Sequence, residues 1–329
     1  MFNESRVTEF LLVGFSIIHG AQVFIFFLFL LVYISTLLGN ILIITLVMTT
    51  PQFKTPMYFF LCNLSFMEIW YTSVTLPKML QDILSETRLI SVTGCIAQCY
   101  FFFVLGGTEN YFLAVMAYDR YLAICNPLRY SSIMNRVLCC QFAIGCWICS
   151  IVGSLLPLYW VCTLSFCGSN QINHFFCDMI PLLNISCTDT SKLKTYFFII
   201  AWTVIFSCLF FTILSYIKII LTILKIPSSS GKSKAFSTCV SHLTVVVIYY
   251  TSVILIYVRS PKGQTFEFDK IISVFYAVVT PLLNPIIYSL RNKEVRNVMK
   301  LVKIRFCAKV KQTVVSNVMV EDFYRKESL

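Results

Sequence analysis

Long apolar segments separated by short charged clusters dominate the pattern of hydrophobic and polar positions. No Asp, Glu, Lys or Arg occurs from Phe10 to Phe53 or from Val137 to Asn173. Five further windows contain at most one acid or one histidine. A helix needs about 20 apolar residues to cross the hydrocarbon core of a bilayer, and each window is long enough. The pattern predicts seven spans, at about 22–48, 57–80, 91–124, 138–160, 194–225, 235–258 and 269–290.

The length of these apolar segments selects the fold class. Only helices and closed barrels cross lipid, and these segments are too long and unbroken for barrel strands. We therefore predict an all-α membrane protein, a seven-transmembrane helix bundle. Composition agrees, since 58% of the 329 residues are hydrophobic and 12% are charged, about half the charged fraction of soluble domains.

The predicted organisation has three parts: a tail at 1–21, the transmembrane domain at 22–290 and a segment at 291–329. In that segment, apolar residues recur at helical spacing, with basic residues on the other side; the apolar ones are Val295, Val298, Met299 and Val302. This pattern predicts a short amphipathic helix on the membrane surface. A frayed basic tail is the alternative.

The basic residues predict the orientation of the chain. With the N-terminus outside the cell, 18 of the 26 Lys and Arg residues fall on the cytoplasmic side, as the positive-inside bias requires. The net charge of +11 then indicates contact with anionic lipid and no nucleic-acid partner. This orientation predicts a multi-pass protein of the plasma membrane.

Four cysteines fall on the predicted outer side, where the environment is oxidising. They are Cys95, Cys167, Cys177 and Cys187. Four cysteines can pair in three ways, and spacing does not choose among them. Asn3 begins an Asn-Glu-Ser glycosylation acceptor in the outer tail. His174 precedes Cys177, but a disulfide at that cysteine leaves no metal site there, so no metal is expected.

Two charged or proline-containing motifs lie at the inner ends of predicted helices. Asp119, Arg120 and Tyr121 end the third helix, and the Asn-Pro-x-x-Tyr sequence from Asn284 through Pro285 to Tyr288 ends the seventh. Both motifs resemble the signatures of rhodopsin-like G-protein-coupled receptors. Pro285 removes a backbone hydrogen bond and permits a bend. The resemblance implies that Asp119 holds Arg120 in the resting state and releases it on activation.

Longer segments narrow the resemblance. "PMYFFLCNLS", "MAYDRYLAICNPLRY", "KAFSTCVSHLTVV" and "PLLNPIIYSLRNKEV" are similar to sequences of vertebrate odorant receptors. The resemblance implies pairing of Cys95 with Cys177 and of Cys167 with Cys187, and it places Tyr216 and His242 in the switch region. It also implies a small hydrophobic odorant, a stimulatory olfactory-type G protein that raises cyclic AMP, no enzymatic activity, and location in sensory cilia.

Carried over by motif position, the resemblance implies an apolar ligand pocket between the outer halves of helices 3, 5, 6 and 7. The ligand is expected to be neutral, because no acid precedes Glu109 in helix 3 to serve as a counter-ion. Tyr250 or Tyr257 is expected to donate the hydrogen bond that orients it. The expected lining is Phe102, Phe103, Gly106, Gly107, Met179, Ile200, Val204, Tyr250, Val253, Ile254 and Tyr257.

Glu68 and Glu109 are the carboxylates deepest in the predicted membrane. By resemblance both face the bundle interior near Asn284, where the family has a sodium site. Glu68 departs from the pattern, because most family members have Asp there. Two close carboxylates do not both ionise cheaply, so either a sodium ion or a pair of protonated, hydrogen-bonded acids is expected.

Two rival classes make different predictions. A transporter requires an inverted repeat or a continuous polar stripe, and the sequence has neither. A membrane enzyme requires converging catalytic side chains, and no nucleophile–base pair lies in the helices. A receptor for a metabolite that is not an odour remains an alternative within the receptor class.

Overall fold

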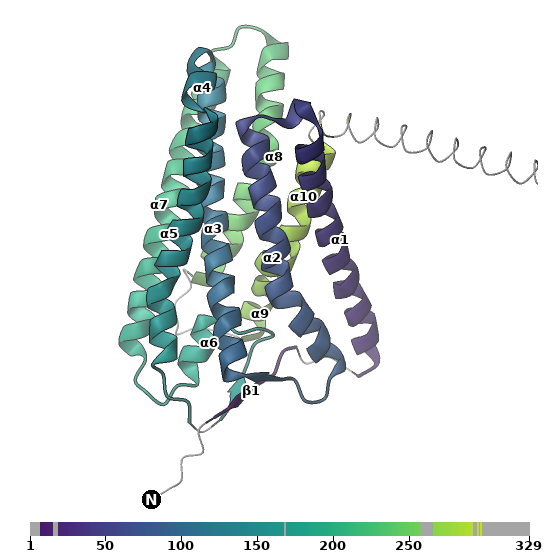
Figure 1. Ribbon diagram of the computed structural model, residues 1–329, viewed down its shortest axis with the longest axis vertical. Helices are drawn as coiled ribbons and strands as arrows, with labels where there is room; N and C mark the ends of the chain where they lie inside the picture. The colour runs from purple at the N-terminus through teal and green to yellow at the C-terminus, as the bar shows by residue number, and fades with distance from the viewer. Residues whose placement is uncertain are drawn as a thin grey trace, which may run out of the picture. The chain divides into compact units, whose positions relative to one another are not determined.

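The computed structural model describes residues 7–15, 19–167, 169–257, 266–291, 295 and 297. The chain forms two compact units, residues 1–285 and 286–329. The first contains a bundle of long helices (Figure 1). Within the described residues these helices are α1 (Gln22–Thr49), α2 (Pro56–Leu84), α3 (Val92–Cys125), α5 (Arg136–Cys162), α7 (Ser191–Leu224) and α8 (Ser229–Tyr257). A seventh consists of α9 (Phe266–Val274), η4 (Phe275–Val279) and α10 (Thr280–Arg291).

The helical architecture confirms the predicted seven-transmembrane bundle. Six described segments are long and apolar enough to cross a membrane: α1, α3, α5, α7, Cys239–Ile256 and Phe268–Tyr288. The further helix, α2, carries Glu68 in its interior and the ion pair of Lys78 with Asp82 near its end.

Local sequence signals fix several helix starts. The hydroxyl of Ser91 accepts a hydrogen bond from the backbone N–H of Gly94 at 3.1 Å and caps α3. The side chain of Asn135 caps α5 by accepting from the N–H of Leu138 at 2.9 Å. Pro56 occupies the first turn of α2, where its missing N–H leaves no helical bond unmade.

Helix α3 lies at the centre of the bundle, and α1 lies at its edge. In the most apolar window of α3, 56% of residues are buried, against 17% for α1. Phe24 and Met48 of α1 are each 72% exposed. Large apolar side chains with this much exposure suit a surface covered by lipid rather than water.

A small sheet crosses one end of the bundle, here called the sheet end. Strand β1 (Glu9–Leu12) pairs antiparallel with β2 (Leu89–Ser91) and parallel with β3 (Gln171–Ile172). The short helix α6 (Met179–Asn184) follows β3, and α4 (Pro127–Ile133) lies at the opposite end (Figure 1). The sequence analysis predicted only a tail at 1–21, so this sheet is a structural addition.

The seventh helix contains a π-helical segment, η4, that the sequence analysis did not predict. One extra residue per turn widens the helix there, and Tyr276 of η4 is 4% exposed. Pro285 follows within α10, and a Cβ added to Gly39 of α1 would lie 3.0 Å from the Pro285 Cβ. Glycine at position 39 therefore permits the close approach of α1.

Some predictions concern residues outside the described ones. Asn3 and most of the proposed amphipathic helix, including Val298, Met299 and Val302, fall there. Val295 is described, is helical and is 4% exposed.

Candidate ligand site and switch residues

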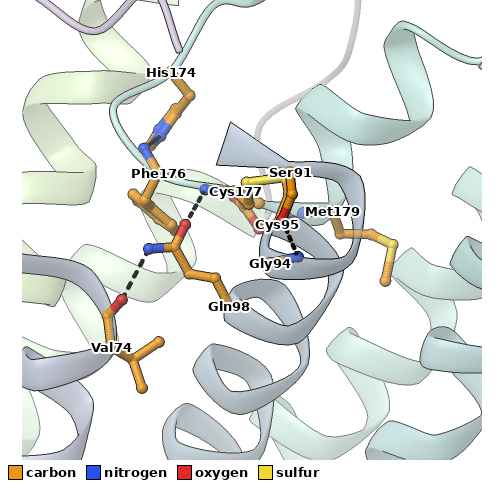
Figure 2. The surroundings of a disulfide bond; sticks show 10 residues. Val74, Ser91, Gly94, Cys95, Gln98, His174, Phe176, Cys177 and Met179 are labelled. Carbon is orange, nitrogen blue, oxygen red and sulfur yellow. Dashed lines mark hydrogen bonds between the residues drawn. A yellow bond between two sulfur atoms is a disulfide. The ribbon is translucent and has the colours of Figure 1, made fainter. Parts of the chain in front are cut away.

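Two disulfides hold the loop between α5 and α7 at the sheet end. Cys95, at the start of α3, bonds to Cys177, and Cys167 bonds to Cys187. Gln98 lies one helical turn after Cys95 and bridges two segments (Figure 2). Its amide donates to the Val74 carbonyl at 2.8 Å and accepts from the Cys177 N–H at 2.9 Å. Gln98 was not predicted from the sequence, because a lone glutamine in a helix belongs to no motif.

His174, within this loop, is buried as a neutral ring. Its Nδ1 accepts from the N–H of Phe176 at 3.4 Å, and its Nε2 lies 3.2 Å from the Ser273 hydroxyl. Burial, reinforced by the positive charge of Lys270, lowers the pKa of His174 to about 3. Lys270 is 1% exposed and donates to the carbonyl of Gly14 at 2.5 Å, which ties the N-terminal segment to α9.

Asp178 follows Cys177 directly, and its pKa is shifted upward, whereas that of His174 is shifted downward. Burial raises the pKa of Asp178 to about 6, and the negative charge of Asp269 adds to the rise. The hydrogen bond that the Met179 N–H donates to the Asp178 carboxylate at 2.7 Å opposes it. The loop thus buries one group that resists protonation and another that favours it.

An apolar cavity of about 140 Å³ lies between α3, α5, α7, α8 and η4. A cavity of about 150 Å³ lined by apolar side chains holds a molecule the size of benzene. Seven residues expected from motif position line it: Phe102, Phe103, Gly106, Gly107, Ile200, Val204 and Val253.

Four other expected lining residues lie elsewhere. Met179 lines a smaller neighbouring cavity between α3 and α5. Tyr250 and Ile254 are not in the lining, whereas Tyr249 is. Tyr249 and Val253 are four residues apart and share one face of α8, whereas Tyr250 and Ile254 lie about 100° further round the helix. The Tyr257 side chain lies outside the described ones.

Polar groups in the cavity are few and mostly engaged. Ser150 donates to the Val104 carbonyl at 2.5 Å, and Tyr249 donates to the Gly106 carbonyl at 3.0 Å. Asn110 donates to the Val204 carbonyl at 3.2 Å, while its Oδ1 is buried without a hydrogen-bond partner among the described residues. Asn110 therefore offers an acceptor in the cavity lining that has no hydrogen-bond partner among the described residues, and it was not predicted from the sequence.

Gly106 and Gly107 both line the cavity, as expected, but the space beside them differs. A Cβ at Gly107 would lie 2.5 Å from the Ser150 Oγ, whereas one at Gly106 would meet only ordinary contacts at 3.9 Å with Tyr71. Gly107 therefore permits the close packing of α3 against α5.

A buried acidic pair lies deeper in the bundle. Glu68 and Glu109 are 0% and 1% exposed, and the side-chain amide of Asn284 donates to Glu68. The two carboxylates are close enough to interact electrostatically. One oxygen of each, together with Asn284 Oδ1, is buried without a hydrogen-bond partner among the described residues. These three oxygens form a donor set that suits a hard cation or shared protons.

Arg120 is held at the α4 end by Asp119. The Arg120 Nη2 lies 2.6 Å from Asp119 Oδ2, and Tyr130 of α4 donates to the other carboxylate oxygen at 2.7 Å. Asp119 is 0% exposed and Arg120 is 8% exposed. Because both oxygens of Asp119 are engaged, the ion pair is fixed in one geometry. The sequence analysis did not identify Tyr130 as a partner.

The remaining switch residues lie on neighbouring helices. Tyr216 of α7 and His242 of α8 share a hydrogen bond of 2.7 Å between the hydroxyl and Nδ1. Tyr216 belongs to a buried cluster with Ala117, Ile219, Ile223 and Cys239, against which Tyr121 packs. Tyr288 lies in α10 and is 1% exposed.

A seven-helix bundle with an internal apolar cavity, a disulfide at the start of α3 and a buried Asp-Arg pair at its end is typical of rhodopsin-like receptors. The sequence profile described as "Olfactory receptor" matches residues 29–307. The chain therefore belongs to the olfactory receptor family, whose members are receptors, and it is a multi-pass membrane protein.

Individual relatives show the same relationship over nearly the full length. Olfactory receptor 6F1 of Homo sapiens is 50% identical over 297 residues, which are 90% of this chain and 96% of that protein. Olfactory receptor 6N1 of Homo sapiens is 47% identical over 298 residues, 91% of this chain and 96% of that protein. Olfactory receptor 287 of Rattus norvegicus is 48% identical over the same shares of both chains.

Proposed function

We propose that the cavity binds small, neutral, volatile organic molecules and that binding activates a stimulatory olfactory-type G protein, which raises cyclic AMP. The observation that carries this proposal is the cavity itself, about 140 Å³ in volume and lined mainly by aromatic and aliphatic side chains. Its lining contains no charged residue among those described. An ionised ligand would lose its hydration there without gaining a counter-ion.

Asn110 is the group best placed to orient a ligand. A ligand hydroxyl that donates to its free Oδ1 would satisfy a buried acceptor that otherwise lacks a partner. A buried acceptor left without a partner costs about 1–3 kcal/mol. An alcohol is therefore expected to activate the receptor at lower concentration than the matching ether, and Asn110→Leu is expected to remove the difference.

The Asp119–Arg120 pair acts as the resting latch. Ligand binding shifts a pre-existing equilibrium by its differential affinity for two states, and Arg120 leaves Asp119 in the active state to contact the G protein. Two Arg120 nitrogens donate to the same oxygen, Asp119 Oδ2, at 2.6 and 3.2 Å, and the Tyr130 hydroxyl donates to Oδ1; these contacts support this assignment of the resting state. The sheet end is extracellular, the α4 end is cytoplasmic, and the expected location is the ciliary membrane of olfactory neurons.

Glu68, Glu109 and Asn284 form either a sodium site or a shared-proton site. Their three buried oxygens without partners fit both. Sodium would supply a positive charge that lets the acids ionise, and it would stabilise the resting state. Glu68→Gln distinguishes the two, because it removes charge and retains one oxygen. A sodium-dependent rise in thermal stability that this variant loses supports the ion, and stability independent of sodium supports the protons.

Cyclic AMP accumulation tests the main proposal. Cells expressing the chain with the olfactory G-protein subunit are exposed to a broad panel of neutral volatiles. We expect a dose-dependent response that Arg120→Ala abolishes at equal surface expression. Arg129→Ala is the matched control, because Arg129 is an exposed arginine on α4. Silence across the panel at confirmed surface expression, or an equal response in Arg120→Ala cells, contradicts the proposal.

A further inference from the structure

The cavity is closed toward the sheet end. Phe176 is 0% exposed, and its ring centroid lies 4.6 Å from that of Phe102 in the cavity wall. The disulfide between Cys95 and Cys177 fixes the backbone beside Phe176, and Gln98 adds two hydrogen bonds there (Figure 2). A ligand that entered through this end would have to displace a buried, covalently tied aromatic segment.

The exposed part of the cavity wall lies on a different face. The lining residues of α8 and η4, including Tyr249 and Tyr276, are buried. By contrast, Cys149 and Gly153 of α5 line the cavity and are exposed on the outside of the bundle. Across from them, Ile200 of α7 is half-buried. The cavity therefore reaches the surface between α5 and α7.

The packing of the helices explains this opening. Helix α3 packs extensively against both α5 and α7, whereas the described parts of α5 and α7 scarcely approach each other. They meet near the sheet end, where the rings of Trp160 and Tyr196 lie 6.0 Å apart. Away from this contact, beside Gly153 and Ile200, the gap between the two helices is the window.

The window faces lipid. Gly153 lies nine residues before the end of α5, about 14 Å along the axis at a rise of about 1.5 Å per residue. That depth is within a hydrocarbon core about 30 Å thick. Val152 and Leu156, beside it on α5, are 58% and 47% exposed, as expected for a surface in contact with acyl chains.

We propose that ligands enter the cavity from the bilayer, laterally, through the window between α5 and α7 that Cys149, Gly153 and Ile200 border. The inference rests on the proposed function of the cavity as a ligand site. Neutral organic molecules concentrate in hydrocarbon because transfer of apolar surface out of water is favourable, by about 25 cal/mol per Å². The apolar rim offers such a molecule a path that never exposes it to water.

Glycine at position 153 makes the proposal testable without disturbing the fold. No heavy atom lies within 4 Å of a Cβ built at Gly153, and the same holds for Gly145 on the same helix. Gly145 does not line the cavity. Side chains added at either position meet open space, but only those at position 153 obstruct the window. Gly153→Leu and Gly153→Trp are the test variants, and Gly145→Leu and Gly145→Trp are their controls.

The experiment uses trifluoromethyl-phenyldiazirine, a small neutral photoreactive probe that partitions into bilayers. The purified receptor in lipid nanodiscs is mixed with the probe, illuminated after delays from milliseconds to minutes, and analysed by mass spectrometry. The readout is labelling of Tyr249 and Val253, which line the cavity and are each 5% exposed. Labelling of Leu255, which is 47% exposed, reports the probe in the lipid.

We expect early labelling of Tyr249 and Val253 in the wild type. In Gly153→Leu the onset of this labelling is delayed by about tenfold, as for an obstructed association step. The final level of labelling equals that of the wild type. In Gly153→Trp the delay is longer. The Gly145 variants behave as the wild type. The proposal is overturned by labelling of Leu255 without labelling of the cavity, by unchanged onset in both Gly153 variants, or by equal delays in the Gly145 variants.

A plateau in Gly153→Leu that stays low at every delay also overturns it, because the added side chain then fills the cavity. The assay requires neither agonist nor G protein. Failure of the lateral path is thereby distinguished from failure of the proposed receptor function, which the cyclic AMP response of the wild type reports.

Discussion

The buried pair of titratable groups at the sheet end predicts an unusual dependence of stability on pH. The His174 pKa is lowered from 6.5 to about 3 in the folded state, so unfolding takes up a proton across this range. Stability contributed by the neutral ring is therefore lost as the pH falls below 6.5. The Asp178 pKa is raised from 3.8 to about 6, so between these values the folded state holds the extra proton, and stability is lost as the pH rises.

The two dependences cancel between about pH 4 and 6. Each pKa unit corresponds to about 1.4 kcal/mol, and because neither group differs by a full proton across the whole range, each alone changes the free energy of unfolding by about 2 kcal/mol over these two pH units. The signs are opposite, which leaves the wild type almost insensitive to these two groups. Asp178→Asn retains an oxygen to accept the Met179 N–H and leaves only the histidine. Its stability should fall by about 2 kcal/mol from pH 6 to pH 4 relative to the wild type.

The converse variant should show the reverse trend. His174→Asn leaves only the aspartate, so its stability relative to the wild type should rise by about 2 kcal/mol from pH 6 to pH 4. Thermal unfolding in nanodiscs, followed by tryptophan fluorescence at half-unit steps of pH, measures both trends. The double variant is the control and should parallel the wild type, because all other titrating groups are common to the four proteins. Parallel curves for the wild type and both single variants would refute the reasoning.

Three further predictions concern single contacts. Gln98→Leu leaves a buried N–H and a buried carbonyl unpaired and should destabilise the protein by about 2 kcal/mol. The thermal midpoint should fall in this variant and stay unchanged in the control, Gln141→Leu, whose side chain is exposed. Tyr130→Phe removes the hydroxyl that donates to the Asp119 carboxylate in the resting ion pair, a loss of about 1 kcal/mol. Basal cyclic AMP per surface receptor should therefore rise about fivefold. An unchanged basal level contradicts the role of the ion pair as a latch. Gly107→Ala introduces a 2.5 Å contact with the Ser150 hydroxyl and should lower the free energy of unfolding by about 1–3 kcal/mol. The double variant with Ser150→Ala, in which the closest remaining contact is 3.5 Å, should recover the thermal midpoint.

The transmembrane helices could be predicted because hydropathy is a property of each segment alone. The window free of charge from Phe10 to Phe53 predicts a span wherever neighbouring helices pack, and α1 (Gln22–Thr49) falls at the predicted place. The strand β1 could not be predicted in this way. Glu9–Leu12 becomes a strand because Phe10 lies opposite Ile90 and Leu11 opposite Gln171, and both partners are distant in sequence.

The cavity shows where prediction by motif position loses accuracy. Phe102 and Phe103 lie near the disulfide that anchors α3, and both line the cavity. On α8, Val253 lines the cavity as predicted, but Tyr249 does so in place of Tyr250, because motif position does not determine which part of the helix surface faces the cavity and adjacent side chains point about 100° apart. Asn110 was missed for a different reason. Its amide is distinguished only by an acceptor without a partner, which is a property of the packed structure.

The contacts that stabilise the loop at the sheet end and the proposed entrance for ligands lie on different faces of this receptor. The residues that close the sheet end, Gln98, His174 and Asp178, hold the loop through buried hydrogen bonds and a disulfide. None of these three borders the window between α5 and α7, where Gly153 meets open space. A loop that opened for each ligand would repeatedly break the buried hydrogen bonds of His174 and Asp178 and expose both side chains to water, which conflicts with the role of these residues in holding this end closed. A lateral entrance removes that conflict, because the ligand passes between helices while the buried loop stays closed.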